Sequence, residues 1–129
     1  MSENFVVEII SPDKLVLKSD ATEVTIPSYE GQMGILNNHI PLITFLRPGI
    51  ITIKNNDEKK FYVEEGTVEF SNNNLLILTS TAKDLANFDK TLVNDLLQKA
   101  EAKLNNSNST DKDRYVVSYK IETLREISQ

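Results

Sequence analysis

The sequence contains no cysteine and only one histidine, His39, among its 129 residues. Without cysteine the chain can form neither disulfide bonds nor thiolate metal sites, and its composition fits a reducing compartment. His39 has no second histidine, cysteine or acidic residue at ligand spacing nearby, so a metal-binding or general-base role is not indicated. We therefore expect no metal site and a turn or interface position for His39.

Two further features are missing, namely a long apolar run and an excess of positive charge. No segment reaches the roughly 18 apolar residues that a membrane-spanning helix requires, and residues 1–4 lack the basic start of a signal or transit peptide. The formal net charge is -5, whereas nucleic-acid binding depends on clustered Lys and Arg. We expect a soluble globular protein that stays where it is made and binds no nucleic acid.

The motifs of common catalytic and phosphate-binding sites are also absent. The spacing Gly31-x-x-Gly34 matches neither the P-loop nor the dinucleotide fingerprint, and no Gly-x-Ser-x-Gly elbow is present. The adjacent acids Glu64 and Glu65 would face opposite sides of a strand, which favours a solvated edge over an acid/base pair. We predict no catalytic residue and therefore a non-catalytic interaction protein rather than a small enzyme.

Residues that constrain the backbone are concentrated in residues 27–49, which hold three of the four prolines and three of the four glycines. Glycine permits positive φ and proline fixes φ, so this stretch predicts loops of fixed shape. Short runs rich in Val, Ile and Thr lie on both sides of it, separated by turn residues. They predict eight to ten antiparallel strands, arranged as a β-sandwich or flattened barrel over residues 1–84.

Alternation within these strands predicts which side chains face inward. In the hairpin of residues 51–63, Phe61 and Val63 should face the core while Tyr62 faces solvent. Residues 75–79 are apolar at almost every position, which predicts cover on both faces. An alternative function, a free-standing β-sandwich that binds a carbohydrate or small ligand, would need exposed aromatic side chains, and Tyr29 and Tyr62 are the candidates.

After Thr81 the apolar residues no longer recur at every second position but at every third or fourth. Residues 89–104 predict a helix that Asn87 or Asp89 can cap, and a second helix begins at the capping-box variant Thr110-x-x-Asp113. The apolar stripe of the second helix comprises Val117, Ile121, Leu124 and Ile127. Because the connection between the helices is short, we predict an antiparallel helical hairpin over residues 85–129 as a second domain.

The central stretch also resembles the signature of the F-type ATP synthase epsilon subunit. The matching residues are Pro27, Glu30, Gly31, Gly34, Ile35, Leu36, His39, Pro41, Leu42, Ile43, Thr44, Leu46, Pro48 and Gly49. Residues 7–12 and 66–70, Leu78 with Ala82, and the two C-terminal helices extend the resemblance over nearly the whole chain. It implies a β-sandwich of about ten strands followed by a helical hairpin, which agrees with the fold class predicted from the residues.

The resemblance implies a non-catalytic rotor subunit in the central stalk of a proton-translocating, bacterial-type ATP synthase. Such a subunit links the gamma subunit to the ring of membrane c subunits and helps couple proton translocation to ATP synthesis. It would be peripheral, on the cytoplasmic face of the bacterial inner membrane, and would meet the membrane only through the c ring. By this resemblance Glu30, Gly31 and Gln32 face the c ring, and His39 lies near the gamma contact.

The sequence departs from the family pattern in the same loops. Gln32 stands where Glu is common, and Ser28 stands where Gly is usual. Asn37 and Asn38 replace a frequent Pro-Gly pair. We expect the loop to keep its shape, because Asn also tolerates left-handed backbone angles.

The helical hairpin carries two further implications of the resemblance. In many bacterial members it can reach the catalytic beta and alpha subunits and block ATP hydrolysis, a role that would fall here to Lys112, Arg114, Lys120 and Arg125. Some members bind regulatory ATP through an Ile/Leu-Asp-x-x-Arg-Ala motif, of which this chain keeps Asp89 but has Leu92 in place of the Arg. Because an aliphatic side chain cannot pair with phosphate, we expect no bound ATP and no cofactor.

Overall fold

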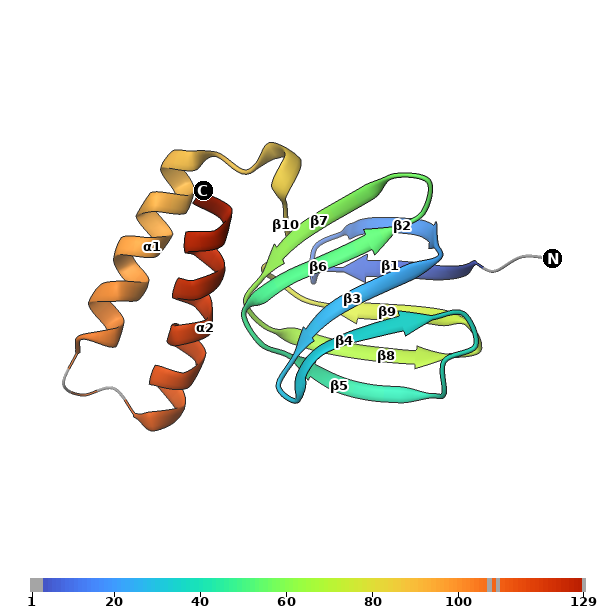
Figure 1. Ribbon diagram of the computed structural model, residues 1–129, viewed down its shortest axis with the longest axis horizontal. Helices are drawn as coiled ribbons and strands as arrows, with labels where there is room; N and C mark the ends of the chain where they lie inside the picture. The colour runs from blue at the N-terminus through green and yellow to red at the C-terminus, as the bar shows by residue number, and fades with distance from the viewer. Residues whose placement is uncertain (1–3, 107, 109, 129) are drawn as a thin grey trace. The chain divides into compact units, whose positions relative to one another are not determined.

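The computed structural model describes residues 4–106, 108 and 110–128 (Figure 1). The chain divides into two compact units, one ending at Ala86 and the other beginning at Asn87. Among the described residues, the first unit holds ten β-strands and the second holds two α-helices, with the short 3-10 helix η1 (Leu85–Asn87) at the boundary.

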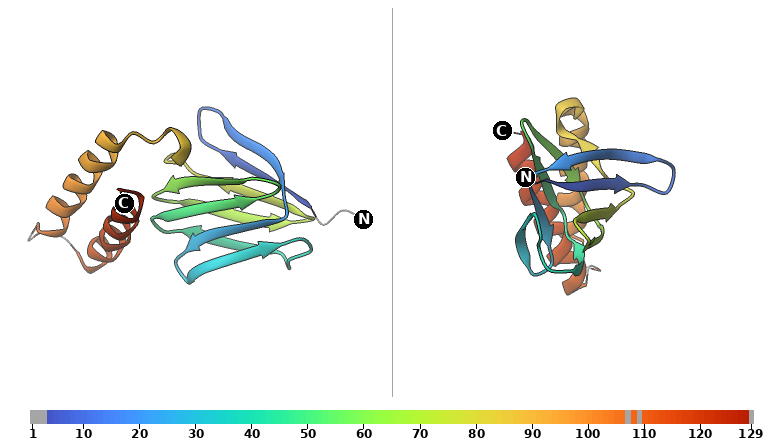
Figure 2. Two further views of the ribbon diagram at one scale, coloured as in Figure 1. Left: turned by 45° about the horizontal axis from the view of Figure 1, so that its top comes forward. Right: turned by 90° about the vertical axis from the view of Figure 1, so that its right-hand side faces the viewer.

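The ten strands of the first unit are short and form one continuous sheet. They are β1 (Phe5–Ile10), β2 (Leu15–Ala21), β3 (Glu23–Ser28), β4 (Gly31–Leu36), β5 (Leu42–Leu46), β6 (Gly49–Lys54), β7 (Glu58–Val63), β8 (Gly66–Ser71), β9 (Asn74–Leu78) and β10 (Lys83–Asp84). Their order is β10-β7-β6-β3-β5-β8-β9-β1-β2, and β4 pairs with β3 outside this path. Strands β1 and β9 run parallel, and the other pairs are antiparallel. Figure 2 shows how the sheet curls, with the β1–β2 hairpin in blue at one side.

The core of this unit lies on the inner face of the curled sheet. Ile51 and Ile53 on β6 are buried, as are Phe61 and Val63 on the neighbouring β7, which confirms the inward set predicted from alternation. The same face of β1, β8 and β9 supplies further apolar side chains, which form one cluster with the first set. Because β-branched residues dominate this cluster, their pleated packing accounts for the strand-rich fold.

Two turns require backbone angles that most residues avoid. Gly66, at the start of β8, has φ +152°, and a Cβ built there would lie 2.5 Å from the Leu78 carbonyl oxygen. Asn72 and Asn73 in the β8–β9 turn have φ of 52° and 55°. Asn tolerates this left-handed region because its short polar side chain can bond locally, and Gly has no Cβ to collide.

The second unit is the predicted antiparallel hairpin of α1 (Lys90–Leu104) and α2 (Asp111–Ser128). Ala100 of α1 packs against Val117 and Ile121 of α2, which lie on the predicted stripe. At the start of α2, Thr110 Oγ1 accepts from Asp113 N at 3.1 Å and Thr110 N donates to Asp113 Oδ2 at 3.4 Å. These reciprocal bonds form the expected capping box.

The predicted fold class, a ten-stranded β-sandwich or flattened barrel followed by an antiparallel helical hairpin, is confirmed, with the ten strands joined in one curled sheet. Two burial predictions are wrong. Tyr62, expected to face solvent, is completely buried, and Leu78, expected to be covered, is 44% exposed. Alternation assigns each residue to one of two faces, but it does not determine how far a side chain on the outer face is exposed.

Candidate functional site

The first candidate contact is the tight turn between β3 and β4. The residues before and after it, Ser28 and Gly31, are register partners, so Tyr29 and Glu30 form the two-residue tip. The buried Ser28 hydroxyl donates to the Gly31 carbonyl at 2.7 Å and accepts from the Glu30 amide at 3.2 Å. Gly31 has φ +122°, a region open mainly to glycine. The turn is therefore rigid, while the Glu30 and Gln32 side chains remain exposed.

The second candidate contact is the connection between β4 and β5, which contains His39. Asn38 has φ 66°, so the expected left-handed conformation is confirmed. Its amide donates to Asn73 Oδ1 at 2.8 Å, and Asn73 Nδ2 donates to Asn38 Oδ1 at 3.0 Å. These two bonds link the β4–β5 connection to the β8–β9 turn. Local sequence patterns give no sign of this pair, because the two residues lie 35 positions apart.

His39 is partly buried at the same end of the sheet. Its amide donates to the Leu36 carbonyl at 3.1 Å, and its ring meets the Phe70 ring edge to face at a centroid distance of 5.9 Å. Its Nδ1 lies 2.7 Å from the Ile40 carbonyl oxygen. Among the described residues no group of three or more His, Cys, Asp or Glu side chains could hold a metal ion. His39 therefore packs in a turn, and its neighbour in the chain, Ile40, is an exposed apolar residue.

On strand β5, two large apolar side chains face outward and a polar side chain faces the core. Ile43 and Phe45 point outward and are 76% and 60% exposed, whereas Thr44 between them points inward and is 6% exposed. Leu42 and Leu46, which share the inner face with Thr44, set this orientation, because a one-residue shift would turn both of them outward. This surface was not among the predictions, although the polar Thr in the pattern Leu-Ile-Thr-Phe-Leu is the signal that could have indicated it.

The exposed residues of β5 continue across neighbouring strands. By register, Ile43 pairs with Glu69 on β8, and Glu69 pairs with Leu76 on β9; the next row joins Phe45, Thr67 and Leu78. On β1 the same rows reach Glu8 and Ile10. We call this surface, made of Ile43, Phe45, Thr67, Glu69, Leu76, Leu78, Glu8 and Ile10, the outer face. Neighbouring apolar side chains that are exposed together mark interaction sites.

The structure does not bring the two candidate loops together. The β4–β5 connection with His39 leads into the first residue of β5, Leu42. The tip of the β3–β4 turn lies at the other end of β5, where the Tyr29 amide donates to the Phe45 carbonyl at 3.3 Å. At about 3.3 Å per residue, the two loops are on the order of 15 Å apart. Figure 1 shows them at opposite ends of the sheet.

In the helical unit, Asp89 acts as the N-cap of α1. Its Oδ1 accepts from the Thr91 amide at 2.9 Å, and its own backbone is extended, with φ -68° and ψ 133°. This bond satisfies one of the free amides at the helix start. Leu92, at the position of the missing Arg, is 38% exposed. A structural role therefore accounts for Asp89.

The four basic residues proposed for inhibition do not form one stripe on α2. Arg114 and Arg125 are eleven positions apart and so lie within about 20° of each other around the helix, while Lys112 and Lys120 fall on the opposite side. Lys112, Arg114 and Arg125 are exposed, and Lys120 is partly buried. The helix therefore presents two separate basic pairs.

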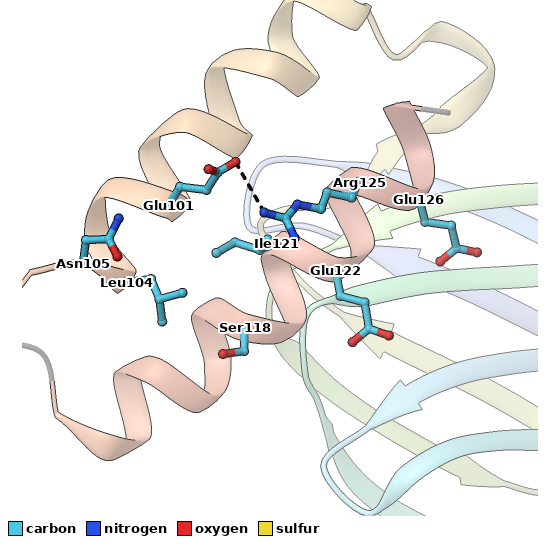
Figure 3. Close-up of a pocket in the computed structure, with 8 residues that line it drawn as sticks. All are labelled: Glu101, Leu104, Asn105, Ser118, Ile121, Glu122, Arg125 and Glu126. Carbon is cyan, nitrogen blue, oxygen red and sulfur yellow. Dashed lines mark ion pairs between the residues drawn. The ribbon is translucent and has the colours of Figure 1, made fainter.

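A groove of about 690 Å³ lies between the two helices (Figure 3). It is lined by Glu101, Leu104, Asn105, Ser118, Ile121, Glu122, Arg125 and Glu126. The Arg125 side chain points toward Glu101, and the nitrogen and oxygen are 4.0 Å apart. The two side chains are 62% and 45% exposed, so solvent screens this pair and it stabilises the hairpin little. Three carboxylates beside one guanidinium make the groove acidic, unlike a phosphate site.

Tyr62 on β7 lies in an environment that disfavours the charged phenolate. Burial raises the pKa of this phenol well above its ordinary value, and the nearby Glu64 carboxylate raises it further. The Tyr62 hydroxyl donates to Glu64 Oε2 at 3.0 Å. The phenol therefore stays protonated in the folded protein, as a structural donor. It is not available as an exposed aromatic platform for a ligand.

Comparison with known proteins yields a consistent set of similarities. Residues 4–84 match the family described as ATP synthase, Delta/Epsilon chain, beta-sandwich domain. The chain is 47% identical over 130 residues to the ATP synthase epsilon chain of Pelagibacter ubique, covering 99% of this chain and all of the relative. It is 34% identical over 106 residues to the epsilon chain of Sinorhizobium fredii, covering 81% and 79% of the two chains.

Two solved chains share the fold. One belongs to the mitochondrial ATP synthase of Euglena gracilis, solved as OSCP/F1/c-ring; its TM-score is 0.80 at 20% identity, with coverage of 100% of this chain and 84% of that one. The other belongs to the central stalk and c-ring of the Tetrahymena thermophila mitochondrial enzyme, with a TM-score of 0.63 at 17% identity and 96% coverage of both chains. Within the described residues, no helix is long and apolar enough to cross a membrane.

Proposed function

The chain belongs to the ATP synthase delta/epsilon family, and from this premise we propose that it is a non-catalytic rotor subunit of F1 that links the gamma subunit to the c ring. In that position it helps couple proton translocation to ATP synthesis at catalytic sites on other subunits. The solved chains that share its fold come from assemblies named for the c-ring and the central stalk. The full-length match to an epsilon chain supports the role of the whole chain.

The orientation of β5 is the observation that carries this proposal. Full burial of an Ile or Phe side chain yields about 1.5–3 kcal/mol, and Ile43 and Phe45 leave most of that unrealised in the isolated chain. A partner that covers the outer face would recover it. We assign this face, together with His39 in the connection that precedes β5, to the gamma contact. A sheet also loses little conformational entropy on binding, which suits a part that must transmit torque.

The second contact of a linking subunit must be separate from the first. The β3–β4 turn meets this requirement, because it lies at the end of β5 opposite to His39 and is stiffened by Ser28 and Gly31. We assign its exposed residues Glu30 and Gln32, with Gly31, to the c ring. Contact with the membrane would then be indirect, and the chain would lie peripherally on the cytoplasmic face of a bacterial inner membrane.

We further propose that the helical hairpin restrains ATP hydrolysis by contact with the catalytic beta and alpha subunits. Basic pairs on opposite sides of α2, Arg114 with Arg125 and Lys112 with Lys120, would each meet acidic residues there. Deleting residues 111–129 should then raise the ATPase rate of the assembled complex. An unchanged rate would refute the inhibitory role and leave the linking role intact.

No cofactor forms part of this proposal. Regulatory ATP needs a cation at the Leu92 position, and Asp89 is engaged as a helix cap. Titration of the intact chain with labelled ATP should show no saturable binding, and binding in the micromolar range would contradict this point.

Binding of the full chain to the isolated gamma subunit tests the main proposal. Ile43→Ser and Phe45→Ser should each weaken binding about tenfold or more, because each removes apolar surface from the contact. Leu92→Ser, at an exposed apolar residue of the other unit, is the control and should bind like the wild type. Wild-type affinity in both outer-face variants would refute the assignment, and no binding by the wild type would refute the linking role.

The free-standing ligand-binding module is not favoured by any observation. It required Tyr29 and Tyr62 on a sheet face, and Tyr62 is buried with its hydroxyl bonded to Glu64. Tyr29 is 41% exposed at the tip of a turn, where a single ring forms no stacking platform.

A further inference from the structure

Glu69 is a charged residue within the apolar part of the outer face. Its register partners on both sides are apolar, Ile43 on β5 and Leu76 on β9. The side chains of Phe45 and Leu78, one row further along, are exposed on the same face. Glu69 is itself exposed, and within the described part of the chain no ion pair or hydrogen bond engages its carboxylate.

A partner that covers Ile43 cannot leave Glu69 in water. Adjacent strands are about 4.8 Å apart, so Glu69 lies between Ile43 and Leu76 within one side-chain width of each. A carboxylate that is buried without a partner loses its hydration and gains nothing in return. Binding of an apolar surface alone would therefore be opposed at this position.

The other acidic residue of the same row, Glu8, is in a different position. It lies on β1, two strands from Glu69, and Lys18 on β2 is its direct register partner. A cation of this chain therefore stands beside Glu8 on the same face. Neither direct register partner of Glu69 is a cation, so the charge to be compensated by a binding partner is concentrated at Glu69.

We propose that Glu69 is a specificity-determining residue of the outer face, and that it accepts charge-assisted hydrogen bonds from an Arg or Lys side chain of the gamma subunit. This inference rests on the proposed function, since it names the chemistry of the same contact. A guanidinium fits best, because it can bond both carboxylate oxygens while its planar surface packs on neighbouring apolar side chains. The pair would reject partners that present an acidic or purely apolar surface here.

The test is the binding of the full chain to the purified gamma subunit at low and high salt. Glu69→Gln keeps the size of the side chain and removes its charge; it should weaken binding at least tenfold at low salt, mainly through faster dissociation, and reduce the salt dependence. Glu69→Lys should weaken binding further. Glu65→Gln, at an exposed glutamate between β7 and β8 and outside the outer face, is the control and should change the affinity less than threefold.

The outcomes distinguish a failure of the Glu69 assignment from a failure of the proposed gamma contact. If the wild type binds gamma and Ile43→Ser weakens binding, but Glu69→Gln binds as tightly as the wild type, the inference is overturned and the gamma contact stands. An equal loss in Glu65→Gln and Glu69→Gln also overturns it, since general charge then explains the effect. If the wild type itself does not bind, the proposed function fails. Circular dichroism of each variant confirms an unchanged fold.

Discussion

The paired amides of Asn38 and Asn73 should make a measurable contribution to the stability of the β-sheet unit. We consider the variants Asn38→Gly and Asn73→Gly and the double variant. Both residues have left-handed backbone angles, with φ of 66° and 55°, which glycine adopts without strain. The substitutions therefore remove side-chain bonds without forcing the turns to change shape.

The two single variants remove different numbers of bonds. Asn38→Gly removes the acceptor of the 3.0 Å bond but keeps the backbone amide at position 38, which still donates to Asn73 Oδ1. Asn73→Gly removes both bonds. At about 0.5–1.5 kcal/mol for each net hydrogen bond, and at the lower end for these exposed groups, Asn73→Gly should cost about 0.5–1 kcal/mol more.

A double-mutant cycle isolates the bond between the two side chains. The extra backbone entropy of each glycine in the unfolded chain occurs in the single and the double variants, so it cancels from the cycle. Only the Asn73 Nδ2 to Asn38 Oδ1 bond is shared. We expect the free energy of unfolding to show a coupling of about 0.5–1 kcal/mol between the two sites.

Urea unfolding of the intact chain gives the coupling, and amide hydrogen exchange provides a second readout. Protection of the amide at position 38 should fall in Asn73→Gly and persist in Asn38→Gly, because the first variant alone removes its acceptor. Additive free energies, with a coupling below about 0.3 kcal/mol, would refute the reasoning. So would equal loss of protection in both variants.

Three further predictions concern the two units separately. Gly66→Ala should lower the free energy of unfolding by about 3 kcal/mol in urea titrations, because φ is +152° and the new Cβ would meet the Leu78 carbonyl oxygen. A loss of less than about 1 kcal/mol would contradict this reasoning. Above the ordinary tyrosine pKa of 10.0, the unfolded chain loses a proton that folded Tyr62 retains. The free energy of unfolding should therefore fall as the pH rises, by about 1.4 kcal/mol per pH unit more in the wild type than in Tyr62→Phe. Parallel curves in unfolding experiments between pH 8 and 11 would show that this phenol does not contribute. Thr110→Ala removes the capping hydroxyl of α2 and should cost about 1 kcal/mol, seen as reduced helicity on heating; unchanged helicity would mean that the cap is not needed.

Much of the fold could be predicted from local patterns. The period of two around Ile51 and Phe61 and the stripe through Val117 reflect direct physical requirements, because a strand or a helix has to bury one side. The capping box at Thr110 is likewise local, since its bonds join residues three positions apart. The left-handed turn at Asn38 also followed from its residue type.

The candidate site depended less on local pattern. The turn with Glu30 and the loop with His39 could be named from the family resemblance, but their positions at opposite ends of β5 could not. The exposed face around Ile43 was missed, because apolar residues in a strand are ordinarily assigned to the core. Tyr62 was assigned to solvent because it alternates with core residues, yet it is buried.

The sequence by itself determined the class of elements, the inner face of most strands, the absence of thiol chemistry and the family. These follow from residue types and short spacings, which act through backbone angles and side-chain periodicity. Only the tertiary structure decided that Thr44 faces inward between two leucines, that Asn38 meets Asn73, and that Glu69 lies among exposed apolar side chains. The physical reason is that each of these depends on register between strands distant in the chain, and pairing across a sheet is settled by the packing of the whole core.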